Sequence, residues 1–124
     1  MAVSVTSQTD PYVDKLIVDT DANATAEDNV LPGASTCYIF DTDNSNNSTA
    51  VYAKFYDTGA NTITVIGTHE PHIMMLVPAN TRQVVTISSG IAFAARLSFG
   101  CVVGKATANA VAPTNPVTIR VMAE

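Results

Sequence analysis

The chain has 124 residues, 47% of them hydrophobic and only 14% charged, and this length fits one domain with a core of its own. Eleven acidic and six basic residues give a formal net charge of −5, and the scattered basic residues argue against a nucleic-acid-binding surface, which needs clustered cations. No apolar run is long enough for a membrane-spanning helix, and the N-terminus does not read as a signal peptide, so we expect folding in a cytoplasm.

The N-terminal part of the chain is mostly polar. Residues 1–10 predict a flexible arm, and residues 11–124 predict the single folded domain. A first strand is expected over residues 12–18. Residues 19–35 are polar and acidic and predict a long loop, with one helical turn near residues 25–29.

Residues 49–57 show the clearest strand pattern in the chain. Val51, Ala53 and Phe55 alternate with larger polar or amphipathic side chains, and successive side chains of a strand point to opposite faces. We therefore expect these three residues to face a core and the residues between them to face outward.

Several further short runs are rich in apolar and β-branched residues. The strands expected from them cover residues 36–40, 63–66, 73–77, 82–87, 91–94, 97–103 and 117–121. Polar or small-residue stretches between them, such as residues 41–48, 88–90 and 105–115, predict turns and loops. This spacing is typical of an all-β fold, and we expect a single jelly-roll-like β-sandwich of about eight short antiparallel strands.

Two kinds of cluster offer ligands for a metal ion. His69, Glu70 and His72 supply zinc-type ligands without the helical spacing of a zinc protease, and a surface loop is the simpler interpretation. The Asp-rich runs at residues 19–23 and 41–45 resemble calcium loops but lack the turn glycine and the twelfth-position Glu. We therefore predict no metal, no cofactor and no catalytic residue, and a small enzyme or metal-dependent domain is the alternative.

The chain has two cysteines, Cys37 and Cys101, both in apolar strand-like runs. The simpler interpretation is a pair of buried free thiols that pack as small hydrophobic side chains. A disulfide between neighbouring strands is the alternative, and it requires that the two Cα atoms lie close together.

The candidate interface residues are two pairs. Tyr52 and Tyr56 lie on one face of a predicted strand, and tyrosine is enriched at protein interfaces. Tyr12 and Val13, at the start of the first predicted strand, form the second pair. For the tyrosine pair, the outer surface of an amphipathic sheet is the alternative interpretation.

Four short motifs together resemble a family of small structural proteins of tailed bacteriophages. The motifs are AVYAKFYD at residues 50–57, VIGT at 65–68, LVPA at 76–79 and GIAF at 90–93. In that family a VYxKxYD strand precedes a VGT turn, a VPA corner and a GxAF segment in the same order. With their surroundings, the motifs cover most of the chain.

The chain departs from this family pattern in two places. Asn80 stands where a glycine commonly follows the VPA corner, and Ala95 with Arg96 replaces a small residue and a glycine. Neither change conflicts with the fold that the resemblance implies.

The resemblance implies a virion component without enzymatic activity. A capsid decoration or cement protein is expected, one that is assembled in the host cytoplasm, binds the major capsid protein or other virion proteins, and stabilises the head shell. Such a protein is expected to be a homo-oligomer, with a trimer favoured, and to bind neither nucleic acid nor membrane. A tail, neck or fibre-associated module that contacts the host surface is the alternative.

Overall fold

The computed structural model describes residues 3–7 and 13–124, and this part of the chain contains strands and loops but no helix. The all-β prediction is therefore confirmed, and no membrane-spanning helix exists among the described residues. The eight strands are β1 (Val3–Ser7), β2 (Lys15–Ala22), β3 (Ser35–Asp43), β4 (Val51–Asp57), β5 (Ile73–Val77), β6 (Arg82–Phe93), β7 (Leu97–Val102) and β8 (Val117–Ala123).

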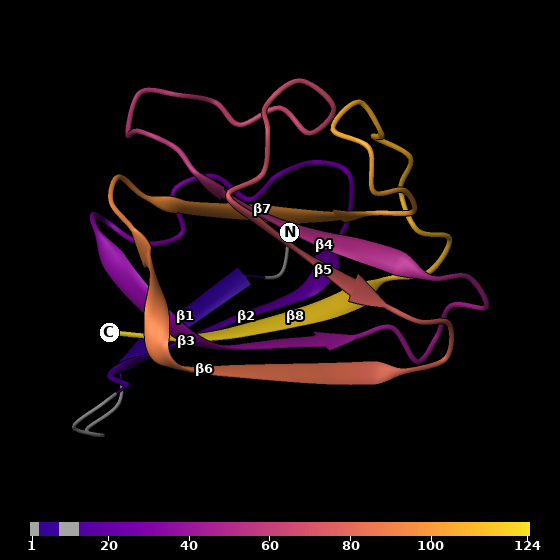
Figure 1. Cartoon of the computed structure of the whole chain (residues 1–124), viewed down its shortest axis with the longest axis horizontal. Coiled ribbons are helices and arrows are strands. Elements are labelled where there is room, and N and C mark those ends of the chain that lie inside the picture. The colour runs from indigo at the N-terminus through magenta and orange to yellow at the C-terminus, as the bar shows by residue number, and fades with distance from the viewer. Residues whose placement is uncertain (1–2, 8–12) are drawn as a thin grey trace.

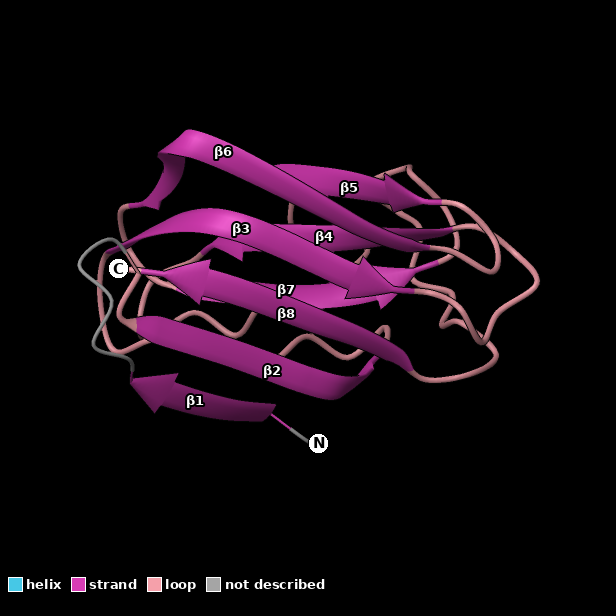
Figure 2. Ribbon diagram, turned by 90° about the horizontal axis from the view of Figure 1, so that it is seen from below, coloured by secondary structure: helices cyan, strands magenta, loops and turns pink. Residues whose placement is uncertain are grey.

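The strands form two sheets that pack face to face as a β-sandwich. The larger sheet has the order β1-β2-β8-β3-β6, the smaller has the order β5-β4-β7, and every strand pair is antiparallel. Figure 1 shows the two layers one above the other, and Figure 2 shows β6 and β5 together along one border of the sandwich.

The strand pairs are nested, as in a long hairpin folded over on itself. β2 pairs with β8, β3 with β6, and β4 with β5. The one position without a regular strand, beside β7, is filled by residues 23–34, where the Glu27 N–H donates to the Phe99 carbonyl at 2.8 Å and the Phe99 N–H donates back at 3.1 Å. Nested pairing of this kind is a jelly-roll arrangement, as predicted.

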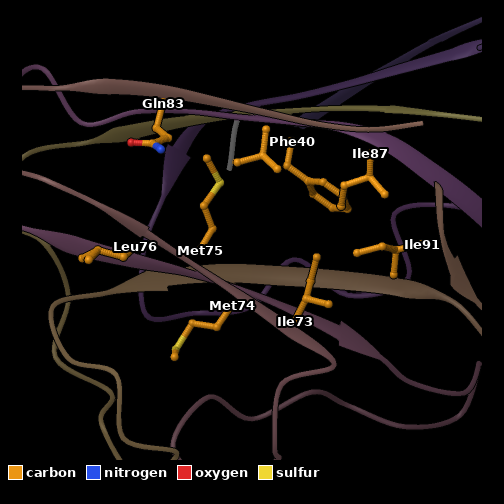
Figure 3. A pocket seen from close by; sticks show the side chains of 9 residues that line it. Phe40, Ile73, Met74, Met75, Leu76, Gln83, Ile87 and Ile91 are labelled. Carbon is orange, nitrogen blue, oxygen red and sulfur yellow. The ribbon is translucent and has the colours of Figure 1, made fainter. Parts of the chain in front are cut away.

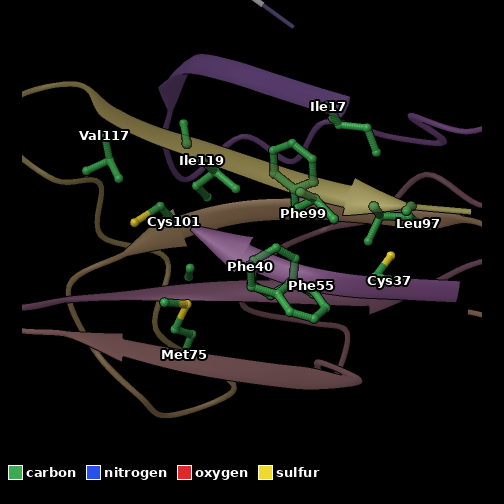
Figure 4. Close-up of a cluster of buried hydrophobic side chains, with 14 of the residues drawn as sticks. Ile17, Cys37, Phe40, Phe55, Met75, Leu97, Phe99, Cys101, Val117 and Ile119 are labelled. Atoms are coloured by element: carbon green, nitrogen blue, oxygen red, sulfur yellow. The ribbon is translucent and has the colours of Figure 1, made fainter. Parts of the chain in front are cut away.

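The core lies between the two sheets and contains inward-facing apolar side chains from both of them (Figure 4). Phe40, Phe55 and Phe99 form its centre, with ring centroids 4.9 Å apart for the first two and 6.0 Å for the last two. Val51 and Ala53 are also fully buried, so the prediction that these β4 residues face a core is confirmed.

The opposite face of β4 is buried as well, which the sequence pattern does not predict. Lys54 is fully buried, and its Nζ donates to the carbonyl oxygens of Ala106 at 2.7 Å and Asn109 at 3.4 Å. Burial lowers the pKa of this amine. Because the loop after β7 covers β4 from outside, this cation is paired with backbone carbonyl groups rather than with water.

Two expectations about the first third of the chain differ from the structure. Val3–Ser7, inside the predicted arm, forms the edge strand β1, which pairs antiparallel with β2 and packs Val3 against the core. The segment around Glu27 is extended beside β7 instead of forming a helical turn, since β7 offers it backbone hydrogen-bond partners. The first strand of the domain itself begins at Lys15 and continues to Ala22.

β6 passes without a break through residues 88–90, where a turn is expected from the sequence. Gly90 has φ of +72°, and the register between β3 and β6 shifts between Cys37 and Ile39. A Cβ atom at Gly90 would lie 2.9 Å from the ring of Tyr38, so glycine is required at this irregularity. The small residues therefore bend the strand rather than end it.

Candidate functional site

The two sides of the sandwich differ in how they are closed. On one side, residues 23–34 lie along β7, and the N–H of Cys101 donates to the Asn23 carbonyl at 2.9 Å. On the other side, β5 and β6 end their respective sheets and are connected only through the turn at residues 78–81. We call this second border the open side.

An apolar groove of about 280 Å³ lies between the two edge strands of the open side. Figure 3 shows that Ile73 and Met75 of β5 point into it, toward Phe40 and toward Ile87 and Ile91 of β6. Gln83, at one end, is the polar side chain of the lining. A groove with this lining suits apolar side chains of a partner.

Exposed apolar side chains also lie on the outer faces of the two strands that border the groove. Met74 and Leu76 of β5 are 43% and 51% exposed, and Val84 of β6 is 53% exposed. Clustered exposed hydrophobic residues mark interaction surfaces more often than single ones do. The other large apolar side chains exposed in the described part of the chain lie on β1 and in loops, namely Val5, Ile63, Val65 and Val111.

β6 is the longest edge strand of the sandwich, with 12 residues, whereas the edge strands β1 and β5 have five residues each. Edge strands leave one row of backbone N–H and C=O groups unpaired, and proteins usually protect them with charges, prolines or short length. Between Gln83 and Ser89, β6 has neither a charged residue nor a proline. It is therefore an unprotected template for another strand.

Of the four candidate interface residues, the structure describes three, and these three do not form one exposed surface. Tyr56 is 1% exposed and packs against Ile66 and Val102, and burial raises its pKa to about 12. Tyr52 is half-buried on the outer face of β4, and Val13 is half-buried just before β2. Tyr12 lies outside the described residues. Tyr56 is thus a core residue of this subunit, because the loops cover its face of β4.

The histidines and the Asp-rich runs have local structural partners. The Val65 N–H donates to His69 Nδ1 at 2.9 Å, whereas His72 Nε2 lies 3.0 Å from the Ala92 carbonyl. The two rings therefore contact different segments of the chain. Asp41 forms an ion pair with Arg82, and its Oδ1 accepts from Nε at 3.0 Å. Across residues 3–7 and 13–124, no three His, Cys, Asp or Glu side chains are grouped as metal ligands.

Asp19 is a buried carboxylate that points into the sandwich from β2. Its Oδ1 accepts the Asp21 N–H at 2.9 Å, while its Oδ2 has no hydrogen-bond partner among the described residues. Burial raises the pKa of Asp19 above 3.8, and the negative charge of Asp21 adds to this increase. The pKa of Glu27 is also raised, by burial and by the charge of Asp19.

Both cysteines are buried free thiols, as the simpler interpretation predicts. Cys37 faces the core from β3, and Cys101 faces it from β7. Burial raises the pKa of each thiol to about 12, so both remain protonated and unreactive at neutral pH.

The groove itself is absent from the sequence-based list of candidate sites. The partial signals were the continuous apolar run in residues 73–77 and the uncharged run rich in β-branched residues at 83–87. Neither run shows that both strands end their sheets on the same side. Comparisons with family models, with curated proteins and with solved structures find no match for this chain.

Proposed function

We propose that this chain is a bacteriophage virion protein that decorates the head shell and stabilises it, and that it carries out no reaction and needs no cofactor. The observation that carries the proposal is the open side, where an apolar groove and exposed Met74, Leu76 and Val84 lie beside unpaired strand edges. Such a surface suits permanent contact with other protein subunits.

The positions of the phage-like motifs in the fold support the proposal indirectly. The AVYAKFYD motif contains β4, LVPA ends β5, and GIAF ends β6, so these motifs specify core strands and the corners between them. Asn80, which replaces a common glycine, has φ of +54°, a left-handed conformation that glycine and asparagine tolerate best. The departure from the family pattern therefore preserves the backbone that the family glycine would provide.

The sandwich also has the rigidity that a decorating subunit needs. The side chain of Asn44 donates to the Thr49 and Pro78 carbonyls, each at 3.0 Å, and that of Asn47 donates to the Asn115 carbonyl at 3.0 Å. These buried amides tie three loops together at one end of the molecule. The end of the molecule where these loops are held together and the apolar open side both favour binding of every copy in the same orientation on a lattice.

The test is to count and locate the protein in particles. Quantitative mass spectrometry of purified virions should give hundreds of copies, and a reconstruction should place them on the head lattice. Particles that lack the protein should lose their contents at a lower temperature than complete particles. A count of a dozen or fewer, with density at the tail or neck, would instead support the host-contact alternative and overturn the proposal.

A further inference from the structure

We propose that two copies of this chain pair through β6 on the open side, so that their five-stranded sheets join into one sheet of ten strands. The inference names the partner of the groove described above and does not depend on virion membership. It rests on the 12-residue edge strand β6, on the groove between β5 and β6, and on the exposed side chains on the outer faces of these strands.

Identical strands that pair antiparallel are related by a two-fold axis, which gives a closed, self-complementary contact. In such a pair, residues directly opposite each other must lie on the same face of the sheet. Gln83, Val85 and Ile87 line the groove, whereas Val84 points outward and is 53% exposed. The axis must therefore pass through a residue, and Val85 or Thr86 at the middle of the uncharged run satisfies this condition.

Neither register brings like charges together across the two-fold axis. With the axis at Val85, Arg82 lies opposite Ser88 of the second copy; with the axis at Thr86, it lies opposite Gly90. Arg82 is in addition neutralised by its ion pair with Asp41 of its own chain.

Asp41 and Asp43 lie on β3 beside β6, where Arg82 forms an ion pair with Asp41, whereas the acidic groups on β2 and beside β7 lie far from this contact. Asp19 and Asp21 are on β2, three strands away from β6, and Glu27 is beside β7 on the other side of the sandwich. Three strand spacings are roughly 14 Å, so the β2 acids of two paired copies are separated by about 30 Å, several Debye lengths at physiological salt. Repulsion between the β2 acids of the two copies therefore opposes this dimer weakly.

The area of the contact is sufficient for a stable dimer. With the axis at Thr86, the nine paired residues 82–90 span about 30 Å, and two sheets about 10 Å apart with their outer side chains make the border about 20 Å deep. Each copy then buries about 600 Å², or about 1,200 Å² in total, which reaches the range of specific interfaces. Met74 and Leu76 lie on the same border and contribute apolar contact to the second copy.

The mass of the isolated protein tests the pairing directly. Light scattering coupled to size exclusion should give about 26 kDa, twice the chain mass of 13.0 kDa. Val84→Lys places two cations near the two-fold axis and should weaken the dimer by about tenfold or more, because like charges across strands repel. Val111→Lys is the matched control, since Val111 is equally exposed but lies in a loop, and it should leave the mass unchanged.

Cross-linking tests the position of the two-fold axis independently of the Val84→Lys variant. Opposed residues at a two-fold axis have Cβ atoms about 4.5–5.5 Å apart, so Val85→Cys or Thr86→Cys should form an intermolecular disulfide under mild oxidation. The native Cys37 and Cys101 are buried and do not compete.

A mass of 13.0 kDa at every concentration would overturn the inference, and so would a trimer. A dimer that is unaffected by Val84→Lys and forms neither disulfide would also overturn it. None of these results would decide whether the protein occurs in virions, because copy counting in particles tests that separately.

Discussion

Replacing Asp19 by asparagine should stabilise the protein at neutral pH. The Asp19 side chain is fully buried, and its Oδ2 has no hydrogen-bond partner among the described residues. An unsatisfied buried polar atom costs about 1–3 kcal/mol, and more when it is charged. The asparagine side chain would keep the Oδ1 acceptor for the Asp21 N–H and remove the buried charge. Its Nδ2 takes the unpartnered place of Oδ2, so only the cost of the buried charge is removed, and we expect the free energy of unfolding to rise by about 1 kcal/mol at pH 7.

The same variant should change how stability depends on pH. The pKa of Asp19 is raised above 3.8 in the folded state, so between 3.8 and that raised value the folded chain binds more protons than the unfolded chain. The contribution of Asp19 to the free energy of unfolding is therefore fully present below pH 3.8 and is lost as pH rises through the pKa of the folded state. The gain from Asp19→Asn should be largest at pH 7 and should fall to within about 0.5 kcal/mol near pH 4.

Urea unfolding at several pH values between 4 and 7 measures both effects, with the difference between variant and parent taken at each pH. Taking this difference removes the contributions of carboxylates that Asp19 does not influence, such as Asp43, whose pKa is lowered by hydrogen bonds from Ser45. Glu70→Gln, at an exposed loop position, is the control and should give a small, nearly constant difference. A loss of stability for Asp19→Asn at pH 7, or a difference independent of pH, would refute the reasoning.

Three further predictions concern the core. Phe55→Ala removes a fully buried ring at the centre of the sandwich and should cost about 3–5 kcal/mol, measured as a lower urea midpoint. Gly100→Ala places a methyl group against the Ile66 side chain and should cost about 1–3 kcal/mol, whereas free accommodation of the methyl group would leave the melting temperature unchanged. Cys37 and Cys101 should react with a thiol reagent only after denaturant is added, and rapid labelling of the folded protein would contradict their burial.

The sequence predicts the strands well where one face of a strand meets the core and local turn residues bound it. β4, β5 and β8 lie close to the predicted residues 49–57, 73–77 and 117–121, because alternation marks β4 and β8, and a short apolar run that ends at Pro78 marks β5. The prediction is less accurate where the outcome depends on a distant partner. Residues 41–43 are polar yet belong to β3, since β6 and β8 pair with them on both sides.

The candidate site shows the same limitation more strongly. Tyr56 looks like a surface residue because it alternates with Phe55, but Ile66 and Val102 bury it from segments that follow later in the chain. The groove depends on β5 and β6 being the last strands of two different sheets. Alternation within one strand carries no information about which strand ends a sheet, so this surface requires the topology.

The open side follows from the unequal lengths of the two strands that border it. β6 has 12 residues and β5 has five, so β6 is much the longer of the two, and only the turn at residues 78–81 joins them. On the opposite side, residues 23–34 provide backbone partners for β7. A long, uncharged edge strand without a partner promotes uncontrolled association. A two-fold pairing satisfies the backbone groups of this edge in both copies and leaves no free edge there for a third chain. Pairing through β6 thus accounts both for the length of the strand and for the absence of charge between Gln83 and Ser89.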